Sequence, residues 1–317
     1  MLLAILFLGA GVGFLIYGAR LLVDGAASLA RRFGVSLLVI GLTVVAFGTS
    51  APELIVNIFA SLKGSADIAI GNVLGSNLAN IFLMLGIAAM IYPLRVQLST
   101  VWKEIPMSLL AVIAVGVMAN DILFDRARAT VISRSEGIIL LFFFIIFLYY
   151  TYGISKVEGE GAPVKIFNPR RSVVMVAGGL LMLFLGGKFM VDGAIAVARI
   201  WGVSEALIGF TIVAVGTSLP ELAASAMAAY KRQADIAVGN IVGSNIFNIF
   251  FILGTSATIR AIPFSTILNV DLLFVVFATV LLFLAFFIGK RHILERWQGA
   301  GFVGIYIIYL IYAIVRG

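Results

Sequence analysis

Long runs of apolar residues follow one another along almost the whole chain, with short polar interruptions between them. A helix needs about 20 predominantly apolar residues to cross the hydrocarbon core of a bilayer. Windows of this kind predict ten spanning helices, at residues 2–30, 35–60, 68–93, 104–121, 133–152, 172–199, 203–229, 237–262, 267–289 and 298–315. Strands of a membrane barrel would be shorter and would alternate apolar with polar residues, so the pattern favours an all-α polytopic membrane protein.

One half of the pattern repeats the other. Residues 41–90 and 209–258, aligned without a gap, are identical at 27 of 50 positions. The offset of 168 residues extends outward, since Asp24 corresponds to Asp192 and Gly34 to Gly202. Each half contains five predicted spans, and because five is odd, the two halves must cross the membrane in opposite orientations. Inverted repeats are typical of transporters, whose substrate site lies near the midplane between the repeats.

The repeats also predict the domain organisation. The first five-helix repeat occupies residues 1–152, with its most similar part, α-repeat 1, at about 35–93. A polar linker follows at residues 153–171, and the second repeat occupies residues 172–317, with α-repeat 2 at about 203–262. We expect the chain to function as a monomer.

Composition agrees with a membrane protein. Hydrophobic residues make up 62% of the 317 residues and charged residues 12%, which lies outside the range of soluble globular proteins. The N-terminus is apolar from Met1 and has no basic segment, so we interpret it as the first span rather than a cleaved signal peptide. The chain has no cysteine, which excludes disulfides and thiolate metal sites.

The net charge of +7 orients the chain and does not indicate nucleic-acid binding, because its basic residues are spread over short loops. Connections after odd-numbered spans contain thirteen Lys and Arg residues, whereas even-numbered connections and the C-terminus contain seven. The positive-inside rule therefore predicts that the odd connections, including the linker, are cytoplasmic and both termini extracellular. A compact chain without targeting or regulatory domains suggests the plasma membrane.

A proline interrupts the second span just before a glutamate. Pro52 has no N–H for the carbonyl of Gly48, so the helix must bend or open and nearby carbonyls from Ala46 onward become available as ligands. Thr49, Ser50 and Glu53 lie three or four residues apart, on one side of the helix. The seventh span repeats the arrangement with Ala214, Gly216, Thr217, Ser218, Pro220 and Glu221.

The third span has a stripe of polar residues at intervals of four, Asn72, Ser76 and Asn80, and the eighth span repeats it as Asn240, Ser244 and Asn248. Glycines at 71 and 75, and at 239 and 243, would allow close helix approach. Such hydroxyls and amides often only join neighbouring helices. Buried glutamates are different, because an acid at membrane depth is costly and is functional by default.

The candidate residues supply only oxygen ligands. Calcium takes about 6–8 oxygens in flexible geometry, whereas transition metals favour imidazole or thiolate. Two glutamates can neutralise one divalent cation and can in turn be neutralised by sodium ions or protons. This exchange of charge is the physical basis of antiport, and it needs no covalent chemistry, so we expect neither enzyme activity nor a cofactor.

The motif Gly-Thr-Ser-x-Pro-Glu followed by Gly-Asn-x-x-Gly-Ser-Asn, present in both halves, resembles the α-repeats of sodium/calcium exchangers in the cation/calcium exchanger superfamily. The resemblance spans essentially the whole chain. It implies ten helices, of which the first and sixth slide over the other eight, and transport of calcium against sodium. It also implies twelve ion ligands: Ala46, Thr49, Ser50, Glu53, Ser76, Asn80, Ala214, Thr217, Ser218, Glu221, Ser244 and Asn248.

One position departs from the family pattern. Sodium/calcium exchangers often have aspartate where this chain has Asn248, which leaves the number and identity of the counter-ions open. Calcium/proton exchangers typically show Gly-Asn-x-x-Glu on the third span, where this chain has Gly75, so we favour sodium and keep protons as the alternative. A passive cation channel is a further alternative from another class of protein.

Charges outside the repeats are interpreted as structural. Arg20 with Asp24, and Lys188 with Asp192, have the spacing of ion pairs along one helix. Asp67 and Asp235 are expected at helix starts, where acids favour the helix dipole.

Overall fold

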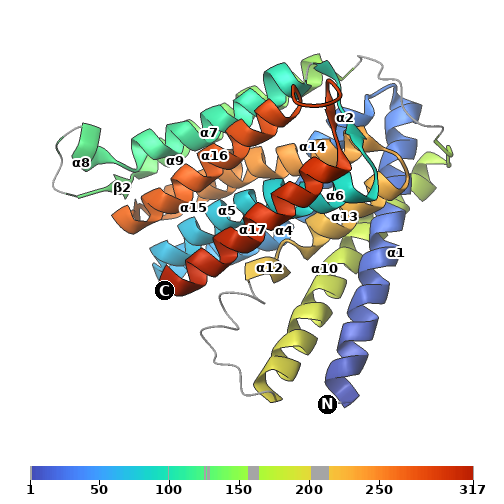
Figure 1. Ribbon diagram of the computed structural model, residues 1–317, viewed down its shortest axis with the longest axis horizontal. Coiled ribbons are helices and arrows are strands. Elements are labelled where there is room, and N and C mark those ends of the chain that lie inside the picture. Colours follow the sequence, from blue (N-terminus) through green and yellow to red (C-terminus); the bar gives the residue numbers. More distant parts are fainter. Residues whose placement is uncertain are drawn as a thin grey trace.

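The computed structural model describes residues 2–98, 100–124, 126, 129–155, 164–200 and 214–316, and helices make up most of it (Figure 1). The α-helices of the first half are α1 (Leu2–Phe33), α2 (Leu37–Ile40), α3 (Ala46–Thr49), α4 (Ala51–Lys63), α5 (Ala66–Ala79), α6 (Leu85–Ile91), α7 (Ile105–Met118), α8 (Asp121–Phe124) and α9 (Arg134–Gly153). Those of the second half are α10 (Pro169–Ile200), α12 (Ala214–Gly216), α13 (Leu219–Tyr230), α14 (Ala234–Ile246), α15 (Gly254–Ile259), α16 (Asn269–Ala285) and α17 (Arg296–Arg316).

Wider π-helical turns continue several of these helices without a break in the chain path. They are η1 (Gly41–Val45), η2 (Asn80–Met84), η3 (Thr100–Glu104) and η5 (Phe247–Leu253), and a 3-10 turn, η6 (Thr266–Leu268), precedes α16. π-Helical turns are rare and frequently occur at functional sites. Two of the four in the described part of the chain begin at or next to predicted ligands, Asn80 and Asn248.

The predicted spans are largely confirmed. Among the described residues, eight helices are long and apolar enough to cross a membrane, and the pair Leu37–Thr49 and Ala51–Lys63 forms a further span bent by 48°. The predicted span 203–229 begins outside the described residues, and α12 and α13 are its described part. The chain is thus an all-α membrane protein, and its layout agrees with ten helices.

Two very short antiparallel sheets, which the sequence analysis missed, join connections of the same parity. Strands β1 (Leu94–Arg95) and β4 (Ile293–Leu294) pair after the third and ninth spans. Strands β2 (Val131–Ile132) and β3 (Ile262–Pro263) pair after the fourth and eighth. Odd and even connections therefore lie at opposite ends, as the alternation of spans requires.

Helices α1 and α10 lie side by side at one edge of the molecule (Figure 1). Glycines seven residues apart on each helix bring the two backbones together. They are Gly11, Gly18 and Gly25 on α1 and their repeat counterparts Gly179, Gly186 and Gly193 on α10. A Cβ atom on Gly18 would lie 2.9 Å from the carbonyl oxygen of Gly179. Such close approach is typical of small residues in membrane helix interfaces. This glycine contact was not predicted from the sequence.

The third and eighth spans form the centre of the molecule. In the apolar part of Ala234–Ile259, 94% of the residues are buried, and in that of Ala66–Ile91, 72%. The corresponding share is 22–39% in the other unbroken spans. Gly243 allows α14 to approach the second span, because its Cβ would lie 2.7 Å from the carbonyl of Leu42, as predicted. At Gly71 and Gly75 a Cβ would meet nothing within 4 Å among the described residues. The counterparts of Leu38 and Leu42, which Gly239 and Gly243 meet, lie outside them, so close approach there stays a prediction.

Candidate cation site

The second and seventh spans break one residue before the place that a proline alone would suggest. Helix α3 ends at Thr49, Ser50 leaves the helical conformation (φ −82°, ψ 6°), and α4 restarts at Ala51. Pro52 therefore lies in the first turn of α4, where an N–H is not needed. Ser218 (φ −91°, ψ 8°) breaks the seventh span in the same way before α13.

The carbonyls at the two breaks differ. The Ala46 carbonyl accepts from the Ser50 N–H at 3.0 Å and from Thr49 Oγ1 at 3.3 Å. Its role as an ion ligand stays a prediction. In the second half the Ser218 N–H donates to the carbonyl of Val215 at 3.2 Å. This bond spans three residues, one fewer than the bond from Ser50 to Ala46 at the first break.

The two glutamates meet at the interface between the repeats. Ser50 Oγ donates to Glu221 Oε1 at 3.0 Å, and Ser218 Oγ donates to Glu53 Oε1 at 3.1 Å. Each carboxylate is only 1% exposed. Because residue numbers in the two bonds differ by 168, they are one contact repeated about the axis that relates the halves. Each half therefore holds the carboxylate of the other.

The serines of the central spans complete this layer. Ser50 Oγ also bonds Ser244 Oγ at 3.0 Å, and Ser218 Oγ bonds Ser76 Oγ at 3.3 Å. Both contacts again join opposite halves. The polar stripes predicted on the third and eighth spans thus face the broken helices.

The predicted asparagine ligands lie in the same interior. Asn80 Nδ2 donates to Asn245 Oδ1 and Asn248 Nδ2 donates to Asn77 Oδ1, both at 3.0 Å. Asn77 and Asn245 were not among the residues predicted from the sequence. The available signal was their presence in the repeated Gly-Ser-Asn motif, one residue away from the predicted stripe.

Five oxygens of the predicted ligands have no hydrogen-bond partner in the described part of the chain, although they are buried. They are Glu53 Oε2, Glu221 Oε2, Asn80 Oδ1, Asn248 Oδ1 and Thr217 Oγ1. A buried polar atom without a partner is costly in an apolar interior. Carboxylate and amide oxygens accept but cannot donate to one another. The arrangement therefore suits a hard cation, or protons on the carboxylates.

The two ends of the site are not equivalent. Thr49 is fully buried and donates to Asn240 Oδ1 at 3.1 Å, whereas the corresponding Thr217 has no such bond. A cavity of about 200 Å³ reaches Thr217; its lining is Pro52, Phe184, Gly187, Lys188, Val191, Asp192, Gly216, Thr217 and Pro220. The described residues thus leave the site approachable from the Thr217 end and closed at the Thr49 end.

The ion pairs at the two ends of the site also differ. Lys188 and Asp192 form the predicted pair along α10, at 2.7 Å. Asp24 instead pairs with Lys231 after α13, at 2.5 Å, so the predicted partner Arg20 was wrong. Asp67 and Asp235 lie in the first turns of α5 and α14, as expected.

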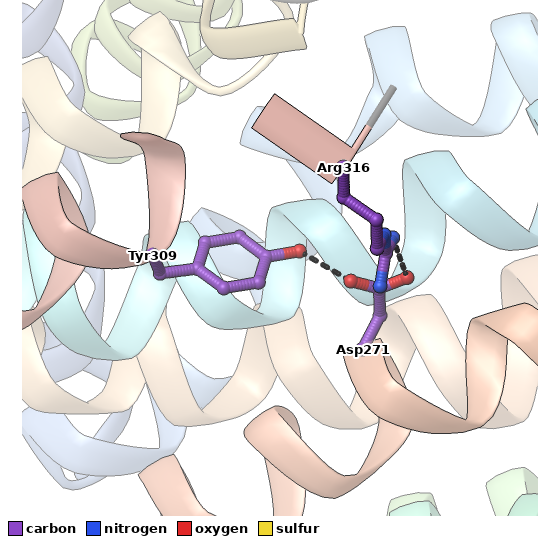
Figure 2. A network of polar contacts seen from close by, with 3 residues as sticks. All are labelled: Asp271, Tyr309 and Arg316. Atoms are coloured by element: carbon purple, nitrogen blue, oxygen red, sulfur yellow. Dashed lines mark hydrogen bonds and ion pairs between the residues drawn. The ribbon is translucent and has the colours of Figure 1, made fainter. Parts of the chain in front are cut away.

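Another buried acid shows what a structural carboxylate looks like in this fold. Asp271 of α16 accepts from the Tyr309 hydroxyl at 2.8 Å and from Arg316 Nη2 at 2.7 Å, both of α17 (Figure 2). Both of its oxygens are engaged, one of them by a cationic side chain. Glu53 and Glu221 each keep an unpartnered oxygen instead.

The chain is similar to several known proteins over most of its length. A family model described as "Sodium/calcium exchanger protein" matches residues 3–153 and 171–315. The sodium/calcium exchanger MaX1 of Methanosarcina acetivorans is 31% identical over 342 residues, covering 95% of each chain. Inner membrane protein YrbG of Escherichia coli is 39% identical over 270 residues, covering 82% of this chain and 81% of its own. A structure of the sodium-calcium exchanger NCX_Mj superposes with a TM-score of 0.84 at 34% identity, covering 98% of this chain and 99% of its own.

Proposed function

Because the chain belongs to the sodium/calcium exchanger protein family, whose members are cation antiporters and not enzymes, we propose that it exchanges calcium for sodium by alternating access. The proposal is carried chiefly by the reciprocal bonds from Ser50 to Glu221 and from Ser218 to Glu53. They place two carboxylates, one from each repeat, against the same buried cluster of oxygens.

Charge favours calcium as the cargo. The two carboxylates balance one divalent cation, and they balance equally well two monovalent ions that replace it. Neutral occupancy matters here, because an uncompensated charge at membrane depth is costly. The proposed ligands are the twelve residues that the motif implies: Ala46, Thr49, Ser50, Glu53, Ser76 and Asn80, with Ala214, Thr217, Ser218, Glu221, Ser244 and Asn248.

Sodium is proposed over protons as the counter-ion. The third span has Gly75 where calcium/proton exchangers typically have an acid, so the acid at that position is missing from this chain. The name of the Methanosarcina relative supports the same choice. The proposed location is the plasma membrane, with odd connections in the cytoplasm and both termini outside, as the distribution of basic residues favours.

Flux measurements test this proposal. Proteoliposomes loaded with sodium and diluted into sodium-free buffer with calcium-45 are expected to accumulate calcium. Vesicles without a sodium gradient are expected to show none. Uptake driven by a pH gradient alone would identify proton exchange, and uptake without any counter-ion gradient would identify a channel; either result would overturn the proposal.

Alternating access is supported by ion pairs that correspond across the repeat. Asp24 pairs with Lys231 in this structure. The repeat counterpart of Asp24 is Asp192, 168 residues later, and that of Lys231 is Lys63, 168 residues earlier. Asp192 is now paired with Lys188, the counterpart of Arg20. In the opposite-facing state, the symmetry places Asp192 against Lys63 and Asp24 against Arg20. The pair Asp24–Lys231 thus holds the Thr49 end closed.

Cysteine labelling tests this exchange of partners, because the chain has no cysteine of its own. Val191→Cys in the cavity wall is expected to react with a maleimide faster than its buried counterpart Val23→Cys. Adding Lys231→Ala is expected to speed labelling at position 23 by about 1.4- to 5-fold, since partly exposed ion pairs contribute about 0.2–1 kcal/mol. Lys63→Ala is the matched control and should leave that rate unchanged or lower it. Equal effects of the two lysine variants would contradict the assignment.

A further inference from the structure

We propose that Asn77 and Asn245 are positioning residues that set the polarity of the cation site, an inference that rests on the proposed function. A side-chain amide has an oxygen end and an NH₂ end of nearly the same shape, and only the oxygen binds a cation. A ligand asparagine therefore works in one of its two orientations. Something beside it must select that orientation.

The selection crosses the interface between the repeats. Asn248 belongs to the second half and donates its Nδ2 to Oδ1 of Asn77 in the first half, at 3.0 Å. Asn80 belongs to the first half and donates its Nδ2 to Oδ1 of Asn245 in the second, also at 3.0 Å. All four side chains are at most 2% exposed, so water does not compete for these bonds.

The oxygens of the two ligand amides are the ends left over. Asn80 Oδ1 and Asn248 Oδ1 are both buried and without a hydrogen-bond partner among the described residues. If either amide were reversed, its oxygen would face the oxygen of Asn77 or Asn245, which places two acceptors together without a hydrogen. The positioning asparagines thus direct the acceptor ends of the ligand amides away from themselves and leave them free for a cation.

Backbone carbonyls anchor the positioning asparagines in turn. Asn77 Nδ2 points to the carbonyl of Asn245 at 3.5 Å, and Asn245 Nδ2 points to the carbonyl of Asn77 at the same distance. A backbone carbonyl can only accept a hydrogen bond, whereas a side-chain amide can rotate and present either its oxygen or its NH₂ group. The polarity therefore runs from a fixed carbonyl through one positioning amide to one ligand amide, once in each direction across the interface.

A double-mutant cycle tests this assignment, with calcium-45 equilibrium binding to the purified protein as the measurement. Asn77→Ala is expected to weaken calcium binding by about 10- to 100-fold, as is typical when a group that orients a metal ligand is removed. In an Asn248→Ala background the same change is expected to cause no further loss, because Asn77 acts through Asn248.

The repeat supplies the matched control. Asn245 acts through Asn80, so Asn245→Ala should keep its full effect in the Asn248→Ala background and lose it in an Asn80→Ala background. If Asn77 had only a structural role, Asn77→Ala would lower calcium affinity equally in the Asn248→Ala and Asn80→Ala backgrounds, and that result would overturn the proposal. An Asn77→Ala variant that binds calcium like wild type would overturn it too. Thermal midpoints identify variants that fail to fold. If Asn77→Ala fails to fold, Asn245→Ala in the Asn80→Ala and Asn248→Ala backgrounds decides whether the proposal holds.

The two proposals fail separately. If the wild type binds sodium-22 but not calcium-45, calcium exchange is wrong, and the same cycle measured with sodium-22 still decides the role of Asn77. A wild type that binds neither ion would overturn both.

Discussion

Replacing Glu53 or Glu221 with glutamine is expected to abolish calcium exchange. The substitution keeps the shape of the side chain and removes one of the two charges that balance a divalent cation. Leaving a buried charge without its partner costs about 3–5 kcal/mol, which corresponds to about 100- to 5000-fold in calcium affinity. Because each carboxylate accepts from the serine of the opposite half in the same way, the two variants should be equally impaired. Calcium-45 uptake into sodium-loaded proteoliposomes measures the loss.

The control for this prediction is a buried acid outside the site. Asp271→Asn removes a charge that Arg316 and Tyr309 already neutralise and bind (Figure 2). It is expected to lower thermal stability, because Arg316 loses its partner, and to leave calcium affinity within about twofold, because Asp271 bonds Tyr309 and Arg316 rather than residues of the site. Full uptake by Glu53→Gln would contradict the proposed mechanism, and so would a loss in Asp271→Asn as large as that in the glutamate variants.

Gly179→Leu is expected to separate α10 from α1 and to destabilise the protein. A Cβ atom at this position would lie 2.6 Å from the backbone nitrogen of Leu22 and 2.8 Å from the carbonyl oxygen of Gly18. Backbone atoms cannot move aside as the end of a side chain can, so the helices must part. Overpacking of this kind costs about 1–3 kcal/mol or more. The measurement is the thermal midpoint in detergent, together with calcium uptake, since α1 and α10 are the proposed moving pair.

The neighbouring glycine separates crowding from the loss of a glycine as such. Among the residues that the structure describes, a Cβ on Gly178 would meet nothing within 4 Å. Gly178→Leu should therefore unfold at or slightly above the wild-type temperature, because leucine favours a helix more than glycine does. A destabilisation shared equally by both variants would show that the contact with α1 is not its cause.

Some features of the site could be predicted because they depend on local chemistry. A proline without an N–H breaks a helix in any surroundings, and an acid at membrane depth needs a compensating cation in any fold. Thr49, Ser50 and Glu53 could therefore be selected before their partners were known. The glycines of α1 and α10 could not, because spacing does not reveal whether a glycine meets a backbone, as Gly179 does, or open space, as Gly178 does.

The sequence by itself determined the membrane-spanning helices, the inverted repeat, and the chemical type of the site, since hydrophobic length, an odd number of spans and two duplicated acids do not depend on packing. The tertiary structure alone decided what lies opposite each of these groups. It brought Ser50 to Glu221 and Asn77 to Asn248, paired Asp24 with Lys231 rather than Arg20, and closed the site at Thr49 while a cavity reaches Thr217. The physical reason is that two identical motifs have the same local preferences, but hydrogen bonds and cavities depend on which distant atoms come within a few ångströms.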